Sequence, residues 1–365
     1  MANTKIITSS MKVENANNFL TDVSSGSYYV FAAKCTPYSP DDSTVPVPQS
    51  LENQAALFDQ IAFGKKLQSA DVSLMIVNSP WITGTLFDQY DQNDPQLSTK
   101  NFYCVTTVGS VNYVYKCLSN NDGTASTIIP SGTSTASFTS PNDGYTWKFM
   151  YSFSDAQNTK FSTTGYIPVT NSAPVVAAAV QGSIDTIVVD SSGSNYNNYL
   201  VGSFGSADIR IGGNPKVYSI SSPGLLFPDF YTGCMIRMTS GSASGQYTYI
   251  DKYAIESGVR KLYLRSAFTS QPVAGDSYAI SPAVSVTGDG NETSNCAAYA
   301  VINPVGNTIS SVAVLSTGSG YRKATAQIVS SNSVGVIGTS NLRCMISPHK
   351  GHGANPAEEK RRSRR

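Results

Sequence analysis

The sequence predicts a mainly β, multi-domain protein with a few helices. Charged residues make up only 13% of the 365 residues, while 29 Gly and 21 Tyr leave a polar, turn-rich composition that suits antiparallel sheets. Helical periodicity is confined to the region before residue 70. Short alternating runs separated by Gly turns fill the region after residue 170. We therefore expect an α+β N-terminal body followed by modules that resemble β-sandwiches or barrels.

Two segments of the N-terminal body have helical spacing. Ser10 can N-cap a short helix that runs to about Leu20. The clearest helical pattern runs from Leu51 to Leu67, with an acidic first turn and a basic last turn that complement the helix dipole. Both helices are expected to pack on a sheet. Its strands are expected at Asp71–Val77, Tyr103–Val108, Tyr113–Leu118 and Thr146–Ser152.

The aromatic strand is the best defined of these. It runs from Tyr145 to Tyr151, directly after an Asn-Asp-Gly turn, and holds Trp147 at its centre. Asx-Gly supplies the positive φ of a tight turn, and aromatic residues pack well on a pleated surface. We expect the Trp147 side chain to be buried.

The second half of the chain contains an internal repeat. A strand followed by Gly193-Ser194-Asn195-Tyr196 aligns, at an offset of 125 residues, with a strand followed by Gly318-Ser319-Gly320-Tyr321. Two copies are too few for a solenoid. We expect two similar strand-turn units, paired within one β-domain, in which each Tyr begins the next strand.

The domain boundaries follow from these differences in residue pattern. Residues 1–170 are expected to form the body, and residues 171–223 with 283–355 a β-domain that holds both repeat copies. Four short strands with Gly turns predict a small inserted β-module at 224–282. Residues 356–365 are expected to be a basic, disordered tail.

Composition excludes several classes of function. The formal net charge is +1, so nothing in the overall balance favours nucleic acid or an anionic membrane as partner. No run approaches the roughly 18 apolar residues of a membrane span, and the N-terminus lacks the apolar core of a signal peptide.

Without a CxxC motif, buried and reduced thiols are expected, with Cys104 and Cys117 the one pair that a hairpin would bring together. The cysteines are Cys35, Cys104, Cys117, Cys234, Cys296 and Cys344.

Candidates for chemistry are few, and we predict no catalytic, cofactor-binding or metal-binding residues. His349 and His352, with Cys344 nearby, have a spacing that can bind metal, but no further ligand pair is evident. Asp41-Asp42 and Asp88–Asp94 are acidic but lack the Gly and terminal Glu of an EF-hand loop. Gly288-Asp289-Gly290 resembles a phosphate or calcium loop only superficially. Asn291-Glu292-Thr293 is a formal glycosylation sequon without a secretory context.

One block of sequence carries a family resemblance. It runs from Asn112 to Val169, beginning NYVYKCLSNNDGTAST and ending PNDGYTWKFMYSF and FSTTGYIPV. This block resembles the baseplate wedge family typified by gene product eight of T-even myoviruses, in the versions carried by marine cyanophages. Tyr28–Lys34 and the prolines after it resemble the family's N-terminal strand and Pro-rich exit. There Ala33-Lys34 stands where Gly-Arg is usual, and Tyr38 where Trp is usual.

The resemblance implies a virion protein without enzymatic activity. Such a subunit is assembled in the cytoplasm of the bacterial host, contacts other baseplate wedge proteins and forms a homodimer within each wedge. Its expected function is structural: it holds neighbouring wedge proteins, and the subunits rearrange when a contractile tail shortens. No small-molecule substrate or cofactor is implied. The composition, with 21 Tyr and few charges, independently predicts a homodimer, or a tight contact with another protein, through the β-rich regions. Such an interface is expected to depend little on salt, since packed uncharged interfaces are weakly screened.

Two other functions remain open from the sequence. A carbohydrate-binding tail or adhesin module would use Tyr231, Tyr247, Tyr249 and Tyr263 of the inserted module as its stacking platform. A polysaccharide-degrading tail enzyme would need two positioned carboxylates, and residues 170–365 offer no convincing pair.

The basic C-terminus also has two interpretations. Residues 360–365 can form a nucleic-acid-binding arm, or they can be a chance ending after a block, ISPHKGHGANPAEE, that continues in relatives. The resemblance favours the second interpretation, in which a frameshift or truncation removes part of the last domain and any partner surface on it.

Overall fold

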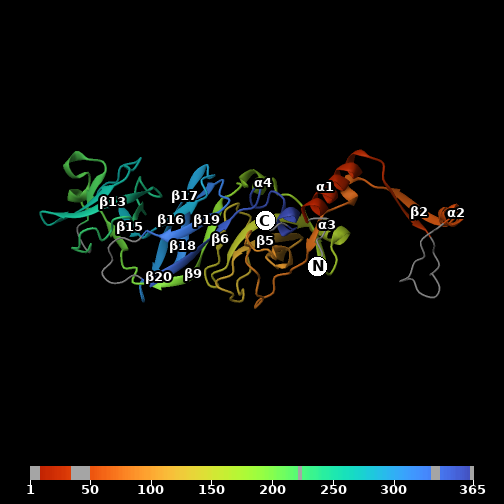
Figure 1. The fold of residues 1–365 in the computed structure, drawn as a ribbon, viewed down its shortest axis with the longest axis horizontal. Coiled ribbons are helices and arrows are strands. Elements are labelled where there is room, and N and C mark those ends of the chain that lie inside the picture. The colour runs from red at the N-terminus through yellow and green to blue at the C-terminus, as the bar shows by residue number, and fades with distance from the viewer. Residues whose placement is uncertain (1–8, 34–49, 221–223, 330–337, 362–365) are drawn as a thin grey trace, which may run out of the picture.

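The computed structural model of the chain describes residues 9–33, 50–220, 224–329 and 338–361. It confirms the mainly β class. The molecule is elongated: a β-module lies at one end, a half-barrel follows, the N-terminal body occupies the middle, and a thin arm extends from the other end (Figure 1).

The body is built on a four-stranded antiparallel sheet of order β4-β5-β7-β6. Both faces of the sheet are buried. Phe102, Val114 and Tyr151 belong to one core, and Tyr115, Cys117 and Trp147 to the other. The strands are β4 (Tyr103–Val108), β5 (Val111–Ser119), β6 (Phe138–Thr139) and β7 (Thr146–Ser154), with a separate pair β3 (Met75–Val77) and β8 (Tyr166–Pro168).

Three short helices, α3 (Asp155–Phe161), α4 (Ala173–Ala178) and α5 (Pro356–Arg361), pack against strands of the body, and the longer α1 (Ser9–Ser25) packs against α5. Ser154 caps α3 by accepting a hydrogen bond from the Gln157 N–H, and the Gln157 side chain accepts from the Ser154 N–H in return. Val175 and Ala357 reach the two cores from opposite sides. The 3₁₀ turns of the body are Ser69–Asp71 and Leu97–Thr99.

The half-barrel is a six-stranded antiparallel sheet of order β18-β17-β16-β19-β20-β9. Its two edge strands, β18 and β9, lie against each other, so the sheet curls almost closed. The strands are β9 (Ile184–Ser194), β16 (Ala283–Gly288), β17 (Ser294–Asn303), β18 (Thr308–Ser319), β19 (Ala324–Ile328) and β20 (Gly338–Ile346).

This half-barrel contains the predicted repeat. Gly193 and Gly318, expected in turns, lie instead near the ends of β9 and β18, and they have the same φ of 58°. Asn195 and Gly320 also have positive φ. The six strands divide into two repeat units. The first unit is β9, β16 and β17, and the second unit is β18, β19 and β20. The first strand of each unit pairs with the last strand of the other, so neither unit completes the sheet alone.

Two equivalent hydrogen bonds support this approximate two-fold relation. The Tyr196 N–H donates to the Asn307 carbonyl at 2.9 Å, and the Tyr321 N–H donates to the Gly182 carbonyl at 3.1 Å. Adding the offset of 125 to residues 182 and 196 gives residues 307 and 321. Both tyrosines are buried. They precede the next strands, at Leu200 and Ala324, by a few residues, so the expectation that each Tyr begins a strand is wrong.

The inserted module is larger than predicted. Its six-stranded sheet, of order β10-β15-β12-β13-β14-β11, takes two strands from residues expected to belong to the β-domain. The module therefore begins near Leu200. The strands are β10 (Leu200–Ser203), β11 (Val217–Ser219), β12 (Met235–Met238), β13 (Tyr247–Glu256), β14 (Val259–Leu264) and β15 (Ser277–Ser281), with 3₁₀ turns at Ser206–Asp208 and Ile211–Gly213.

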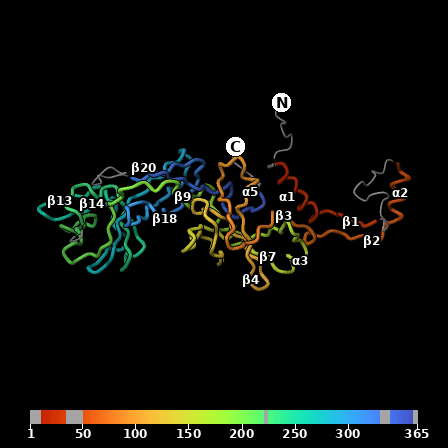
Figure 2. Tube along the Cα trace, turned by 90° about the horizontal axis from the view of Figure 1, so that it is seen from below, coloured from red at the N-terminus to blue at the C-terminus, as the bar shows by residue number. Residues whose placement is uncertain are grey.

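The arm differs from the prediction. The helical pattern from Leu51 holds only for α2 (Leu51–Asp59), which Ser50 caps by accepting a hydrogen bond from the Asn53 N–H. The chain then returns as β2 (Ile61–Lys66), which pairs with β1 (Tyr29–Ala33). Neither α2 nor the β1–β2 pair packs on the body sheet. In Figure 2 the ribbon extends away from the body, with α2 at its far end.

The C-terminal segment also differs from the prediction. Pro356–Arg361 form α5, and Ala357 and Glu359 are 5% and 3% exposed. Lys360 donates to the Lys100 carbonyl and lies 4.8 Å from the centre of the Phe102 ring. The expectation of a disordered tail is therefore wrong for residues 356–361, while residues 362–365 lie outside the described part.

Candidate functional site

The candidates from the sequence do not come together. His349 is exposed, whereas His352 is buried, and Cys344 lies in the half-barrel core. Burial raises the pKa of the Cys344 thiol to about 12. In the described ranges, no cluster of three or more His, Cys, Asp or Glu residues is placed to hold a metal ion.

The remaining candidates form turns or lie outside the described residues. Asp88 accepts a hydrogen bond from the Asn101 N–H, and Asp94 accepts one from the Gln96 N–H. Gly290 donates to Glu292 in the turn that contains the sequon. Asp41-Asp42 lie outside the described residues. These carboxylates order the backbone of loops.

The hairpin brings no disulfide. In the β4–β5 register Cys104 faces Tyr115, two residues from Cys117, and both thiols are buried and free. Burial raises the pKa of both. Cys234, Cys296 and Cys344 are also free and buried, as the sequence predicts, while Cys35 lies outside the described residues.

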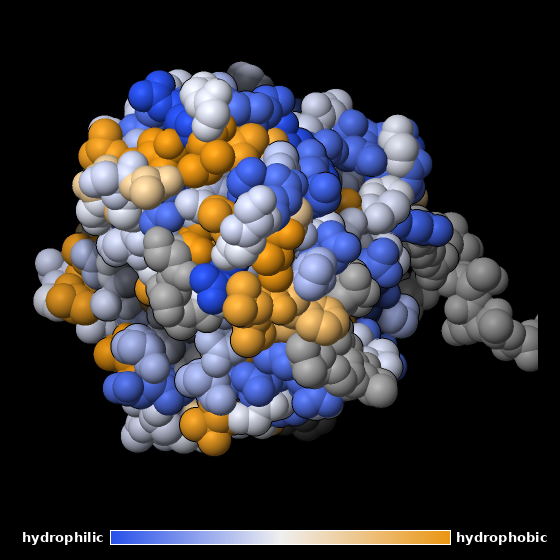
Figure 3. Space-filling view, turned by 90° about the vertical axis from the view of Figure 1, so that its left-hand side faces the viewer, coloured by the Kyte–Doolittle hydropathy of each residue, from blue (hydrophilic) through white to orange (hydrophobic). Residues whose placement is uncertain are grey.

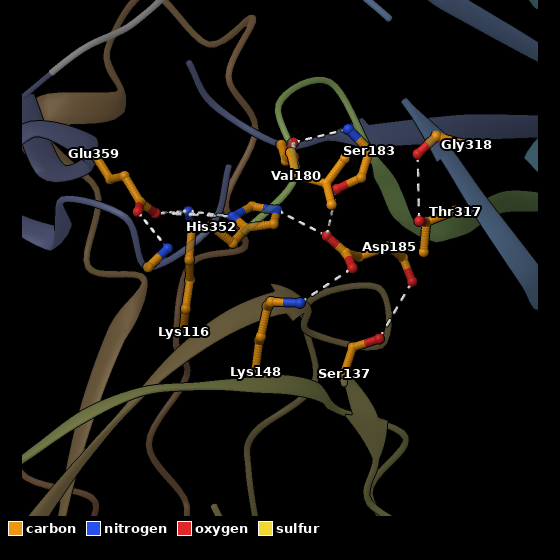
Figure 4. A network of polar contacts seen from close by, with 12 residues as sticks. Lys116, Ser137, Lys148, Val180, Ser183, Asp185, Thr317, Gly318, His352 and Glu359 are labelled. Carbon is orange, nitrogen blue, oxygen red and sulfur yellow. Dashed lines mark hydrogen bonds and ion pairs between the residues drawn. The ribbon is translucent and has the colours of Figure 1, made fainter. Parts of the chain in front are cut away.

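A buried ionic network lies where the body, the half-barrel and the C-terminal segment meet (Figure 4). It starts from an unusual pairing: Lys116 on β5 stands directly opposite Lys148 on β7, and the two side chains share one face of the sheet. Both are buried. Like charges in this position destabilise a sheet, so each lysine needs its own carboxylate.

Glu359 of α5 neutralises Lys116. Its Oε2 lies 2.6 Å from Lys116 Nζ, and its Oε1 accepts a hydrogen bond from the Gly353 N–H at 2.6 Å. Lys116 Nζ also lies 3.3 Å from the centre of the Tyr90 ring, so a cation–π contact adds to the ion pair. Burial lowers the pKa of Lys116 to about 8, against the opposing charge of Glu359.

Asp185 of β9 neutralises Lys148. The carboxylate lies 3.1 Å from Lys148 Nζ and accepts a hydrogen bond from the Ser183 hydroxyl, also at 3.1 Å. Ser137 donates to the Asp185 carbonyl. Burial raises the pKa of Asp185, but His352, Lys148 and Ser183 outweigh it, and the net direction is downward.

His352 joins the two ion pairs. Its Nδ1 lies 2.8 Å from Lys116 Nζ, which can only donate, so Nδ1 is the acceptor and the neutral ring carries its proton on Nε2. That nitrogen lies 3.5 Å from Asp185 Oδ2, beyond hydrogen-bond length. Burial and the Lys116 charge lower the pKa of His352 to about 4. The ring is therefore neutral at physiological pH.

The network acts as a structural connection. A cavity of about 350 Å³ lies against Lys148, Asp185 and His352. Both nitrogens of His352 face charged groups of the network, and each lysine is paired with a carboxylate. The result is a balanced set of charges that fixes β9 and the C-terminal segment to the body sheet.

No family model matches the chain, and no curated protein is similar to it at a significant level.

The tyrosines predicted as a carbohydrate platform do not form one. Tyr231 is 2% exposed and belongs to the module core. Tyr247 and Tyr249 pack with Met235 and Tyr299 at the seam between the module and the half-barrel. Tyr263 binds Glu256 through its hydroxyl. The free end of the module shows hydrophobic patches (Figure 3). The exposed apolar residues of the module include Val201, Leu225, Leu226, Phe227 and Val273.

The arm has the most exposed aromatic surface of the chain described. Tyr29, Phe31, Phe58 and Phe63 are between 53% and 68% exposed. Large exposed apolar patches rimmed by polar residues mark protein contacts in soluble proteins. Sequence reasoning missed this site because it placed the helix of residues 51–67 against the sheet.

None of the helices described combines the length and apolar character that a membrane span requires.

Proposed function

We propose that this chain is a structural subunit of a phage tail baseplate wedge, which holds neighbouring wedge proteins and rearranges when a contractile tail shortens. The arm is the observation that carries the proposal. It projects from the body and exposes aromatic side chains on a two-stranded ribbon, a form that is marginally stable without a partner. Such a feature suits a protein that functions within an assembly.

The rest of the molecule suits the same role. The buried network fixes the body and the half-barrel to each other through Lys116, Asp185 and Glu359. An elongated subunit whose parts are joined in this way can transmit a displacement from one end to the other. The sequence block from Asn112 to Val169 supports the assignment to the wedge family.

Immunoelectron microscopy of purified virions tests the proposal. Antibodies against the chain are expected to label the tail baseplate of the phage that encodes it, and mass spectrometry is expected to find the chain in the particles. A pre-immune serum is the matched control. Absence from the virions, or labelling of the head alone, would contradict the proposal.

A further inference from the structure

The cavity beside the ionic network leads from the surface to the buried charges. Its volume is about 350 Å³. Ala136, Ala178 and Leu315 of its lining are exposed, whereas Lys148 and His352 are buried, so the exposed residues form its mouth and the network forms its inner end. Ligand pockets have volumes of roughly 300–1,000 Å³, so this cavity has the size of a site for a small molecule.

His352 directs one ring nitrogen towards this cavity. Its Nδ1 faces Lys116 and Glu359, and neither is among the described residues of the lining. Its Nε2 faces Asp185, which does line the cavity, but at 3.5 Å (Figure 4). The ring is 1% exposed, and no atom of the described residues accepts a hydrogen bond from Nε2. A buried N–H without an acceptor is costly, so Nε2 can serve as a donor to a molecule bound in the cavity.

Donors and acceptors stand side by side on the polar part of the lining. The Lys148 ammonium donates to Asp185 and has further N–H groups for a ligand. The Asp185 carboxylate accepts from Lys148 and Ser183 and keeps lone pairs for additional hydrogen bonds. Ser137 and Thr317 each donate to a backbone carbonyl, so their hydroxyl oxygens are left as acceptors. A ligand here must both donate and accept.

The balance of charge favours a neutral ligand. Lys116 and Lys148 are paired with Glu359 and Asp185, and His352 is neutral. An anion in the cavity would face Asp185 and a cation would face Lys148, and either ion would leave one charge unpaired beside the network. A hydroxyl group can accept from an N–H and donate to a carboxylate at the same time, so it matches the adjacent His352 and Asp185.

The remaining lining is largely aliphatic. Ala178, Val180, Val314 and Leu315 contribute to it, and none of the described lining residues is aromatic. Water would satisfy the polar groups but would leave these aliphatic side chains in contact with water. A carbon skeleton that carries hydroxyl groups satisfies both parts of the lining.

We propose that this cavity binds a small neutral polyol of about the size of a hexose. The hydroxyl groups of the ligand accept hydrogen bonds from His352 Nε2 and Lys148 and donate to Asp185, and its carbon atoms lie against the aliphatic residues. Because the lining comes from the body, the half-barrel and the C-terminal segment, a bound ligand contacts all three. The site is separate from the arm and does not depend on the baseplate role.

Saturation-transfer difference NMR on the full chain tests the class of ligand. D-glucose, D-galactose and myo-inositol are the neutral probes, and at least one is expected to bind with a Kd of about 1 mM or tighter. D-glucuronate and D-glucosamine, which carry a negative and a positive charge, are expected to bind at least about tenfold more weakly. The proposal is overturned if no neutral probe binds below about 10 mM, which leaves the cavity to water, or if a charged hexose binds more tightly than every neutral one.

Two neighbouring alanines of α4 test the location. Ala178→Leu places a larger side chain at the mouth of the cavity and is expected to raise the Kd at least about tenfold. Ala177→Leu is the matched control, because Ala177 is also exposed but is not among the described lining residues, and its Kd should stay within about twofold of the native value.

Thr317→Val removes one acceptor at nearly constant shape and should raise the Kd roughly threefold to tenfold. Circular dichroism checks that each variant is folded. Equal Kd values for the native chain and all three variants would place the binding elsewhere and overturn the proposal.

The two proposals fail differently. A chain that labels baseplates but binds none of the neutral probes refutes the polyol site alone. A chain that binds a neutral probe in this cavity but is absent from virions refutes the baseplate role alone.

Discussion

At the scale of single residues, Trp147 shows how strongly the body core depends on its aromatic side chains. The ring is fully buried, stacks on Tyr145 with centroids 5.2 Å apart and meets Phe87 edge-on at 5.4 Å. This burial confirms the sequence prediction. The indole Nε1 has no hydrogen-bond partner, so the contribution of Trp147 is packing alone.

Trp147→Ala is expected to lower the free energy of unfolding by about 3–5 kcal/mol, because it removes a large buried side chain and leaves a cavity. Urea titration monitored by circular dichroism measures this change. Trp81→Ala, at the half-buried other tryptophan, is the matched control and is expected to cost less. A loss below about 1 kcal/mol at Trp147 would show that the core collapses around the gap.

His352 predicts a pH dependence of stability. Its pKa is about 4 in the folded chain and about 6.5 when unfolded, so between these values the unfolded chain binds a proton that the folded chain does not. Stability should therefore fall as the pH falls from 6.5 to 4, by at most about 3 kcal/mol. The carboxylates Asp185 and Glu359, whose pKa values are lowered, add a further loss at lower pH.

The comparison of two histidine variants checks this prediction. His352→Gln is expected to flatten the dependence of unfolding free energy on pH between 6.5 and 4. His349→Gln, at an exposed position, is expected to keep the native slope. Equal slopes in all three proteins would mean that His352 is not the titrating group.

At the scale of elements, the C-terminal segment is anchored to the body sheet through α5. Asn355 caps α5 by accepting a hydrogen bond from the Glu358 N–H, and α5 places Glu359 against Lys116. Removal of Glu359 leaves a buried ammonium without its carboxylate, which typically costs about 3–5 kcal/mol. The C-terminal segment should therefore be essential for the stability of the body, although it is far from β5 in the sequence.

Glu359→Gln is expected to lower the unfolding free energy by that amount, and deletion of residues 355–365 by at least as much. Deletion of residues 362–365 alone is the control and is expected to change it little. Glu359→Gln combined with Lys116→Met should cost less than the sum of the single changes, because the unpaired charge is gone. Additive costs in the double variant would contradict a direct pair.

The elements also show what the sequence can and cannot predict. The strands from Tyr103 to Ser154 and the existence of the repeat were predictable because their signals are written in the sequence: alternation, Asx-Gly turns, and the recurrence of a strand ending in Gly-Ser. The end of α2 at Gln60 was not, because β2 forms only through pairing with β1. For α5 a local signal existed, since Asn355-Pro356 is a typical helix start, but the basic run after it dominated the interpretation.

The ionic network was beyond sequence reasoning for a different reason. Lys116, Asp185 and Glu359 come from segments far apart in the chain, and each has a bland local context. No periodicity links a lysine on one strand to a carboxylate more than 200 residues later. Only the fold reveals that two lysines face each other across the sheet and that each requires a buried acid.

At the scale of the whole molecule, the β-module looks like an insertion into the first repeat unit. Its first strand pairs with its last, with Leu200 opposite Ile280, so the chain enters and leaves at one place. The module has its own core, which includes Tyr218, Ile236 and Tyr253. Among the strands described, the half-barrel sheet takes none from the module. Removal of the module should therefore leave the half-barrel intact.

We expect residues 198–282 to fold alone, with a cooperative thermal transition. The fragment should be less stable than in the intact chain, because Met235 and Tyr249 lose their cover at the seam, where the Arg237 guanidinium lies 3.7 Å from the centre of the Tyr299 ring. The chain with residues 200–281 replaced by a short Gly-Ser linker should keep the transition of the body and half-barrel. Calorimetry of both proteins checks this, with the intact chain as reference. A fragment that stays unfolded, beside a linker variant that folds, would show that the module depends on the half-barrel for its stability, and a linker variant that fails to fold would mean that the half-barrel depends on the module.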